Sequence, residues 1–404
     1  MTGRERKEIL GRGPAGRVDP SLVPLGGWYG QEEIDAVMEV LRASADYWTG
    51  FGGSPWVPRF EEEFARYIGS KHAVALNSAG TGLDVVMKCL DLQPGDEVVT
   101  TPMTYIATTH AIMAAGGTCV FADIGDRTFN IDPESVAAKM SPRTRAILPV
   151  HNNGLSVDMD ALIEIAERHP HPKHGPVPVF GDAARACGAG YKGTKAGKKG
   201  AANVFSFQTS KNLTTLGEGG MITTDDESVA KRARRLRSFG WEAGDVVEPG
   251  FNYRMTGIQG AFGSAQLRRL EAMNDRRRDR AQKLTKLLND AVPEVVTPVE
   301  PAGYHHVYYG YTCMVPKAMA GEKRDRLMQV LAQEYKVGSV VMNPPVTIYP
   351  MLRKIGYRPE DTPRANEHGA RLFVLALHPL FQDQDLEFMA AAVAEVFYRV
   401  VRVD

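Results

Sequence analysis

The segment SFQTSKNLTTLGEGG (206–220) has the clearest capacity for chemistry. Lys211 follows an apolar, strand-like run at 202–207 and precedes a Gly-Glu-Gly-Gly turn. Its immediate neighbours are small and polar, which suits a backbone packed closely around a bound group. A lysine in such a pocket can attack an aldehyde as a neutral amine. An isolated lysine is more often a solvated surface residue, so it is the surrounding segment that favours a nucleophile.

Asp182 is a second candidate, because it ends the apolar run PVFGDAARA (178–186). A carboxylate at this place could be a metal ligand, a helix N-cap or the partner of a cationic heterocycle. No His and Asp cluster with ligand spacing surrounds it, so we expect no metal. The third interpretation gains weight beside a nucleophilic lysine. A pyridoxal ring needs an acid that keeps its ring nitrogen protonated and the ring electron-poor.

The loop LNSAGTGLDVVM (76–87) is a candidate phosphate site. Its small residues stand between a predicted strand and a predicted helix. Free backbone N–H groups at a helix start, with Ser and Thr hydroxyls nearby, can bind a phosphate. The loop matches neither GxxxxGK[ST] nor GxGxxG. Many strand-to-helix loops look similar, so this loop alone carries little weight.

These candidates follow strand-like runs that alternate with helical patterns. The alternation predicts a mostly parallel sheet with helices on both faces, which binds ligands at the carboxyl ends of its strands. The strand-like runs are 72–77, 96–101, 117–124, 146–151 and 177–184, and the helical patterns are 82–92, 107–116 and 159–169. A long charged helix at 267–292 should lead to a second α/β unit with a strand at 305–315 and helices at 322–335 and 386–401.

Composition narrows the class of protein. The chain has 404 residues, with 48 Lys plus Arg against 48 Asp plus Glu, so neither a nucleic-acid nor a membrane-surface partner is expected. The four cysteines form no CxxC pair, and no apolar run could span a membrane, which favours a reducing cytoplasm. We expect a flexible N-terminal tail at 1–22, a large domain at 23–268 and a small C-terminal domain at 269–404.

Together, six segments resemble the DegT/DnrJ/EryC1/StrS family of sugar and aminocyclitol aminotransferases. They are NSAGTGL, TPMTYIATTHAI, PVHNNG, FGDAARACGAGYKG, SFQTSKNLTTLGEGG and GFNYRMTGIQGAFGSAQLRRL, in family order from about residue 23 onward. The resemblance implies the α/β fold type I of pyridoxal-phosphate-dependent transferases. Its large domain holds a mixed, mostly parallel seven-stranded sheet, and its smaller C-terminal domain is also α/β. The implied cofactor is pyridoxal 5'-phosphate.

The resemblance also implies roles for single residues. Lys211 matches the family lysine that forms the Schiff base and moves protons between substrate and cofactor carbons. Asp182 matches the carboxylate paired with the pyridine nitrogen. Tyr105 matches an aromatic ring stacked on the cofactor, although it could instead be a core tyrosine near a strand end. Ala184 matches the small residue on the opposite face of the ring.

The implied phosphate site draws on several segments. Its members are Ser206 and the amides and hydroxyls of Ser78, Ala79, Gly80 and Thr81. Asn252 resembles the family asparagine that reaches the phosphate from the neighbouring subunit. The resemblance therefore implies a homodimer with active sites at the interface.

The chain departs from the family pattern at three places. SAGTGL replaces an SGTAAL-like loop, which leaves open which atoms hold the phosphate. Gly181 replaces an acidic residue, for which we expect little effect. Arg185 replaces a His or Gln near the cofactor's phenolic oxygen. A cation there could stabilise the phenolate or hold a donor or substrate carboxylate, or it could turn away into a salt bridge.

Two further segments resemble family segments near the substrate pocket. His305, His306, Tyr308 and Tyr309 lie in one of them, although such residues often only pack at a domain junction. Asn343 begins the other, an Asn-Pro-Pro sequence that could equally be a rigid turn.

The expected reaction moves an amino group from L-glutamine or L-glutamate to a keto-sugar or keto-cyclitol, in aminosugar or antibiotic biosynthesis. One alternative is a dehydratase or lyase, like the family members that make deoxysugars or aminohydroxybenzoate. The deoxysugar dehydratases replace the lysine with histidine, whereas this chain keeps Lys211. The other alternative is a non-catalytic regulatory protein that binds the cofactor. The presence of Lys211, Asp182 and Ser206 disfavours it, because a pure binder needs no nucleophile.

Overall fold

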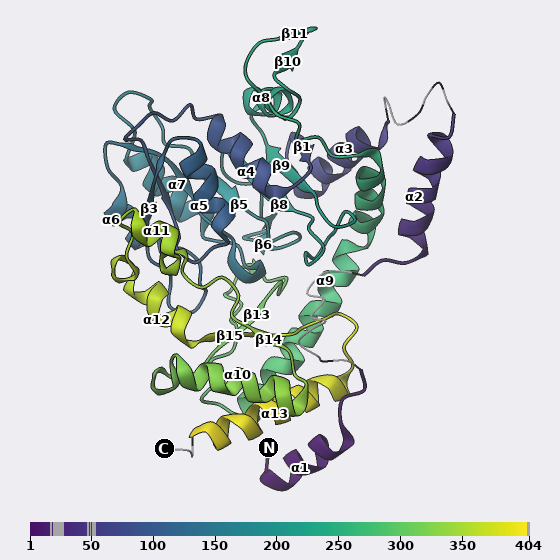
Figure 1. Ribbon diagram of the computed structural model, residues 1–404, viewed down its shortest axis with the longest axis vertical. Helices are drawn as coiled ribbons and strands as arrows, with labels where there is room; N and C mark the ends of the chain where they lie inside the picture. Colours follow the sequence, from purple (N-terminus) through teal and green to yellow (C-terminus); the bar gives the residue numbers. More distant parts are fainter. Residues whose placement is uncertain (17, 19–27, 47, 49, 51–53, 402–404) are drawn as a thin grey trace.

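The computed structural model describes residues 1–16, 18, 28–46, 48, 50 and 54–401 (Figure 1). Its larger part is built around a twisted sheet, and a smaller unit lies beneath it along the long helix α9 (Gly257–Ala291). The predicted boundary at 268 falls inside α9, so this one helix contributes to both units. Within the described ranges, no helix combines the length and the apolar character needed to cross a bilayer.

The sheet of the larger unit has two parts that join edge to edge. One part has the order β1 (His72–Leu76), β9 (Gly220–Thr224), β8 (Ala202–Ser206), β5 (Phe180–Asp182), and the other has the order β3 (Thr118–Phe121), β2 (Glu97–Thr100), β4 (Thr144–Leu148). Parallel bridges from Ile147 to Val179 and from Val150 to Asp182 connect β4 to β5. Strand β9 pairs antiparallel with both of its neighbours, and the other pairs are parallel. The predicted mixed, mostly parallel sheet is confirmed.

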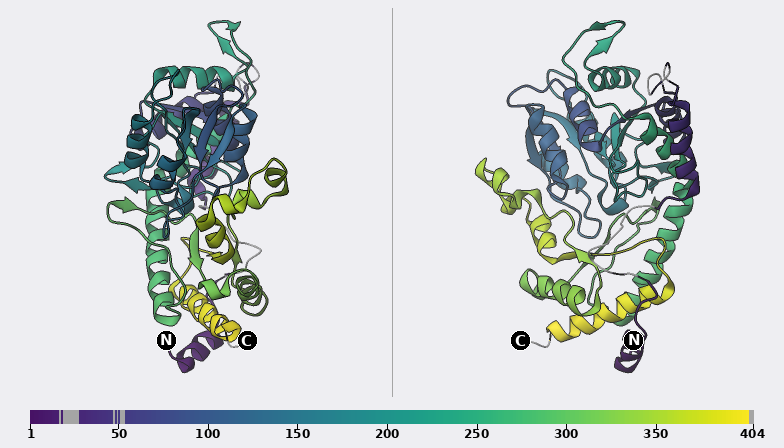
Figure 2. Two further views of the ribbon diagram at one scale, coloured as in Figure 1. Left: turned by 90° about the vertical axis from the view of Figure 1, so that its left-hand side faces the viewer. Right: turned by 45° about the vertical axis from the view of Figure 1, so that its right-hand side comes forward.

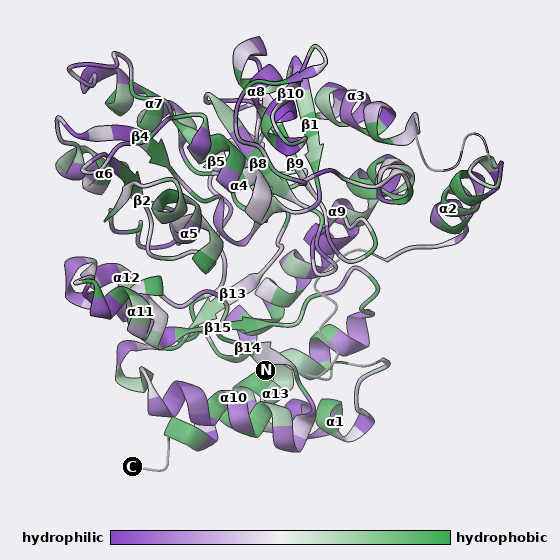
Figure 3. Ribbon diagram, turned by 45° about the horizontal axis from the view of Figure 1, so that its top comes forward, coloured by the Kyte–Doolittle hydropathy of each residue, from purple (hydrophilic) through white to green (hydrophobic). Residues whose placement is uncertain are grey.

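Helices cover both faces of this sheet. Val74 and Leu76 of β1 join a core cluster with α4 (Ala79–Lys88), α5 (Ile106–Ala114) and α8 (Glu227–Arg237). Ala73 and Ala75 of the same strand point to the opposite face, toward α3 (Trp56–Ile68) and the start of α9. Helices α6 (Pro133–Lys139) and α7 (Met159–Arg168) extend that second layer. Strands buried on both faces are mostly apolar, and Figure 3 shows hydrophobic residues along much of the central sheet.

The smaller unit packs a short antiparallel sheet against helices. Its sheet has the order β13 (Tyr311–Met314), β15 (Leu372–Leu375), β14 (Ser339–Val340). Helices α10 (Glu322–Tyr335), α13 (Asp383–Val401) and the second half of α9 close its core. Helix α12 (Pro363–Arg371) joins the smaller unit to the larger one, because Asp123 accepts hydrogen bonds from the backbone N–H groups of Arg364 and Ala365, both at 2.8 Å.

The N-terminal segment differs from the predicted flexible tail. Residues Gly3–Arg12 form helix α1, which lies against α13 at the bottom of both views in Figure 2. Thr2 and Glu5 cap its start reciprocally, and Arg6 pairs with Glu395 of α13 at 3.5 Å. The polar composition hid this helix, although Leu10 packs against the core of the smaller unit. The predicted tail also covers residues 17 and 19–22, which lie outside the described residues.

The predicted strand at 305–315 is also corrected, because two separate strands occupy it. β12 (Tyr304–His305) pairs with β6 (Gly190–Tyr191) of the larger unit, whereas β13 begins only at Tyr311. Between them the backbone turns at Tyr308, which has a left-handed φ of 45°. Gly154 clamps this turn: its carbonyl accepts a hydrogen bond from Val307 N at 3.0 Å.

Gly154 leaves no room for a side chain under this turn. It has a φ of 95°, and a Cβ built on it would lie 2.8 Å from Tyr309 N. We expect Gly154→Ala to destabilise the protein by about 2 kcal/mol more than Gly175→Ala. Gly175 has a similar φ of 75° but open space around it, so this control isolates the clash from the backbone strain. Chemical denaturation measures both, and equal losses would contradict the clamp.

Candidate active site

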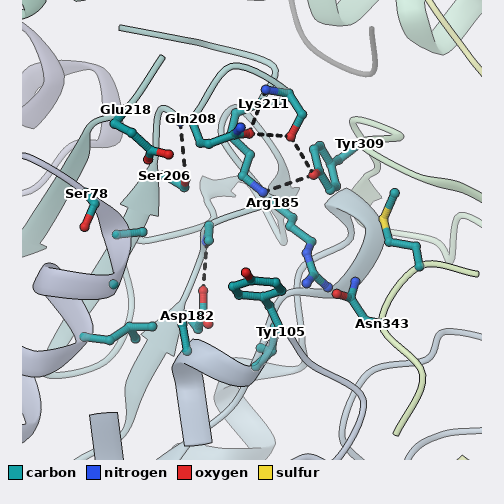
Figure 4. Close-up of a pocket in the computed structure, with 18 residues that line it drawn as sticks. Ser78, Tyr105, Asp182, Arg185, Ser206, Gln208, Lys211, Glu218, Tyr309 and Asn343 are labelled. Carbon is teal, nitrogen blue, oxygen red and sulfur yellow. Dashed lines mark hydrogen bonds between the residues drawn. The ribbon is translucent and has the colours of Figure 1, made fainter. Parts of the chain in front are cut away.

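A cavity of about 600 Å³ opens where several strands of the larger sheet end (Figure 4). Asp182 ends β5, Ser206 ends β8, and Ser78 follows β1, so neighbouring strands deliver their polar side chains to one place. The predicted site residues that line the cavity are Ser78, Ala79, Gly80, Tyr105, Asp182, Ala184, Arg185, Ser206 and Lys211. Two predicted residues, Thr81 and Asn252, do not line it.

Lys211 lies on a folded-back loop between β8 and β9. Phe207 N donates to Gly219 O at 2.8 Å, and Thr209 N donates to Gly217 O at 3.0 Å, which closes the loop on itself. The Lys211 amine Nζ reaches into the cavity and donates to Tyr309 Oη at 3.0 Å. Burial lowers the pKa of Lys211 below its ordinary value. A neutral amine is therefore more accessible here than at an exposed lysine.

Tyr309 is the main site residue absent from the predicted set. The sequence placed its segment near the pocket but gave no sign of which side chain would face it. The left-handed Tyr308 reverses the chain, so Tyr308 stacks on His306 with ring centroids 4.0 Å apart while Tyr309 faces Lys211. Burial raises the pKa of Tyr309, but the positive charges of Lys211 and Arg185 outweigh burial and hold its pKa below the ordinary value. Neither His305 nor His306 lines the cavity.

Asp182 is buried and held from two sides. Its Oδ2 accepts a hydrogen bond from Thr108 Oγ1 of α5 at 2.8 Å, and its Oδ1 accepts one from Ala184 N at 3.1 Å. These bonds fix the carboxylate and leave acceptor capacity for a ring N–H. Thr108 escaped sequence reasoning, since only the packing of α5 against β5 brings it to Asp182.

Gly181 precedes this carboxylate for a steric reason. A Cβ at Gly181 would lie 2.0 Å from Asn203 Oδ1 and 2.9 Å from His151 Nε2. The acidic residue common at this position in the family therefore does not fit here. Burial lowers the pKa of His151 to about 4, so this neighbour of Gly181 is neutral at pH 7.

The start of α4 forms an anion cradle. Ser78 is its N-cap and accepts a hydrogen bond from Thr81 N at 3.2 Å. Thr81 Oγ1 is used within the helix start, where it donates to Asn77 Oδ1 at 2.8 Å. Gly220 of β9 packs so closely that a Cβ there would lie 2.4 Å from the Ser78 carbonyl. The free N–H groups of Ala79 and Gly80, with the Ser206 hydroxyl, suit a phosphate.

Tyr105 precedes α5 and stands in the cavity, as Figure 4 shows. It exposes 64% of its surface, which contradicts the alternative of a core tyrosine. Ala184, which follows β5, also lines the cavity with a side chain small enough to leave room for a flat ring. The residues present therefore fit pyridoxal phosphate: an amine, a fixed carboxylate, an anion cradle and an exposed aromatic ring.

Arg185 is buried at the cavity wall. Its Nη1 donates to Asn152 Oδ1 at 2.9 Å. Asn152 is itself fixed, because its side-chain N–H groups donate to Met103 O at 2.8 Å and Phe129 O at 2.9 Å. Burial lowers the pKa of Arg185. Among the described residues no carboxylate forms an ion pair with it, so the alternative of a salt bridge away from the ring does not occur.

Two other predictions concern the rim. Asn343 lines the cavity, in a left-handed conformation with a φ of 51°. Asn252 has an exposed side chain outside the cavity of its own chain, and its carbonyl accepts a hydrogen bond from Asn77 Nδ2 at 3.4 Å. Sequence reasoning missed Gln208 and Ser210, which also line the cavity.

Comparison with known proteins places the chain in one family. The model of the DegT/DnrJ/EryC1/StrS aminotransferase family matches residues 29–394. The spore coat polysaccharide biosynthesis protein SpsC of Bacillus subtilis is 37% identical, over 93% of this chain and 96% of its own length. A pleiotropic regulatory protein of Geobacillus stearothermophilus is 34% identical, over 91% and 95%.

Solved structures agree. DesV of S. venezuelae superimposes with a TM-score of 0.83 at 32% identity, over 92% of this chain and 95% of that one. The putative sugar aminotransferase Spr1654 of Streptococcus pneumoniae, in its PMP form, gives 0.85 at 25% identity, over 93% and 97%. The chain therefore belongs to the DegT/DnrJ/EryC1/StrS aminotransferase family and is an aminotransferase that depends on pyridoxal phosphate.

Proposed function

We propose that the protein moves an amino group from L-glutamate or L-glutamine to a keto-sugar. The observation that carries this proposal is that the Lys211 amine and the fixed Asp182 carboxylate line one cavity with an anion cradle. The Bacillus subtilis relative is named for polysaccharide biosynthesis, which favours a sugar over a cyclitol as acceptor. The site favours neither destination of the amino sugar, so a role in secondary-metabolite biosynthesis remains an alternative to a role in polysaccharide biosynthesis.

The residues of the chain divide the work. Pyridoxal phosphate, when bound, supplies an electron sink for charge that develops on the substrate carbon. Lys211 would hold the cofactor through its amine and would then take and return a proton. Asp182 would keep the ring nitrogen protonated, and Ser78 with Ser206 would hold the phosphate. Tyr105, which lines the cavity, would pack against the bound ring.

Amino transfer is measured directly with a labelled donor. A nucleotide-linked keto-sugar, a keto-sugar phosphate and a keto-cyclitol are offered as acceptors. We expect mass spectrometry to find ¹⁵N from the amino group of L-glutamate or L-glutamine in the amine formed from one of them. Lys211→Ala should lower the rate by about a thousandfold, because it removes the proton-transferring amine. Lys198→Ala is the matched control, since Lys198 pairs with Asp225 and neither residue lines the cavity.

The same experiment separates the two alternatives. A lyase would consume a substrate with no ¹⁵N in the product. A regulatory protein, in keeping with the name of the Geobacillus relative, would bind the cofactor and convert neither donor. Either result would contradict the proposed transfer.

Arg185 supports an anionic donor. Its guanidinium is buried, faces the cavity and has Asn152 as its neutral partner. A buried cation without a counter-ion is costly, and a substrate carboxylate would offset that cost. We therefore propose that Arg185 binds a carboxylate of the amino donor.

Replacement of this cation tests the donor site. We expect Arg185→Gln to raise the Kd for L-glutamate by about tenfold or more, because a charged hydrogen bond is lost. Titration of the visible absorption of the loaded enzyme with L-glutamate measures this Kd. A shifted absorption band with an unchanged Kd would assign Arg185 to the cofactor's phenolate instead. If neither changed, Arg185 would have no role in binding.

We propose that two copies of the chain complete each other's phosphate site through Asn252. The exposed Asn252 bridges Ser238 at the base of the hairpin formed by β10 (Trp241–Glu242) and β11 (Asp245–Val246). Phe239 and Trp241 of this region expose large apolar surfaces. Such side chains beside an exposed asparagine suit contact with a second copy.

Hybrid dimers decide whether Asn252 acts across subunits. Asn252→Asp should weaken cofactor binding, because its charge repels the phosphate. When this variant is unfolded and refolded together with Lys211→Ala, a mixed dimer has one site with both defects and one with neither. We expect activity to return above that of both parents. If Asn252 served its own chain, every site would carry one defect and no activity would return.

A further inference from the structure

A chain of hydrogen bonds leads away from the Lys211 amine. Nζ donates to Tyr309 Oη at 3.0 Å, and Tyr309 Oη lies 3.1 Å from Ser210 Oγ. Ser210 Oγ lies 2.7 Å from Gln208 Oε1. All four side chains line the cavity, and Figure 4 shows Lys211 and Tyr309 pointing toward each other.

The direction of this chain follows from its last member. Ser210 N donates to Gln208 Oε1 at 2.8 Å, which identifies that atom as the amide oxygen, an acceptor only. The Ser210 hydroxyl must therefore donate its proton to Gln208. The Tyr309 hydroxyl then donates to Ser210, and only a lone pair of Tyr309 remains for Lys211.

This direction determines that the lysine nitrogen donates a hydrogen bond to Tyr309 and does not accept one from it. A neutral amine has one lone pair, and that lone pair does the chemistry of Lys211. If Tyr309 donated to the amine, its O–H would cap the lone pair. We propose that Tyr309, Ser210 and Gln208 form a positioning relay that keeps Lys211 a hydrogen-bond donor and leaves its lone pair free for the substrate side. The importance of this relay for turnover rests on the proposed amino transfer.

Tyr309 is rigidly placed for this task. Val307 N donates to Gly154 O at 3.0 Å, and Gly310 N donates to Asn153 O at 3.1 Å, so both sides of the turn are tied to the larger unit. Asn212, next to Lys211, donates from Nδ2 to Val307 O at 3.2 Å. The tyrosine turn is therefore fixed by backbone hydrogen bonds to the larger unit, and the Asn212 side chain links it to the lysine loop; none of these contacts involves the relay.

The charges that face the relay agree with its direction. Arg185 and Asp182 are the other charged groups that act on Lys211, and Arg185 also acts on Tyr309. The positive charge of Arg185, and that of Lys211 while it is protonated, favours a tyrosine oxygen that presents its lone pairs to them. They also help its proton to move toward Ser210.

The reactivity of the free amine tests this relay without any substrate. The full-length protein is freed of cofactor with hydroxylamine and methylated with formaldehyde and cyanoborohydride over a range of pH. Peptide mass spectrometry gives the rate at Lys211 relative to the exposed Lys317, and the variants are compared at each pH below the one at which Tyr309 loses its proton. In Ser210→Ala the Tyr309 hydroxyl loses its acceptor and turns to the amine. We expect the Lys211 rate in this pH range to fall about fivefold.

A second variant makes the result specific. In a Tyr309→Phe background no hydroxyl can cap the amine, so Ser210→Ala should then leave the rate unchanged. Thr209→Ala, which removes a neighbouring hydroxyl outside the cavity lining, should match the wild type in both backgrounds. A fivefold fall that persists in the Tyr309→Phe background, or no fall in Ser210→Ala alone, would overturn the relay. Since no donor or acceptor is used, failure of the proposed amino transfer would not alter this result.

Discussion

The structure depends on one constraint, which is that a lysine must be able to react as a neutral amine among other charges. Water normally keeps lysine protonated, and only burial makes the ammonium form costly. Lys211 lies buried on the loop that follows β8, and burial together with the nearby cation Arg185 lowers its pKa. Tyr309 accepts a hydrogen bond from the amine through a lone pair of its hydroxyl oxygen. Among the described residues no carboxylate forms an ion pair with Lys211, so a substrate need not displace one to reach the amine.

The fold provides this environment through close backbone packing. Gly220 lets the start of α4 lie on β9, so that free N–H groups face the cavity. Gly181, next to Asp182, lets the strand pack closely against the side chains of His151 and Asn203. Gly154 lets the turn with Tyr309 approach the larger unit. In each case a missing side chain brings two segments together that are far apart in sequence, and the polar groups of the site meet as a result.

The extent to which sequence predicts this site follows from the nature of each signal. Asp182 and Ser206 can be predicted from the sequence, because each ends an apolar strand. A polar residue at that place marks the ligand-binding edge of a parallel sheet. The position of the Tyr309 side chain depends on the left-handed conformation of Tyr308. Bulky residues rarely adopt this conformation, so the sequence does not predict it.

Other features were hidden for related reasons. Thr108 reaches Asp182 only through the packing of one helix on one strand. Helix α1 was missed because its composition is polar, although the spacing of Thr2 and Glu5 is that of a capping box and could have revealed its start. Local patterns thus predicted the elements, and tertiary contacts decided which side chains met.

The most direct test of the account is to find where the cofactor is attached. The purified protein loaded with pyridoxal phosphate is reduced with borohydride, digested and mapped by mass spectrometry. The account predicts that the phosphopyridoxyl group lies on the peptide that contains Lys211, and that Lys211→Ala carries none. Attachment at another lysine, or no attachment in the wild-type protein, would contradict the assignment of Lys211 as the reacting amine.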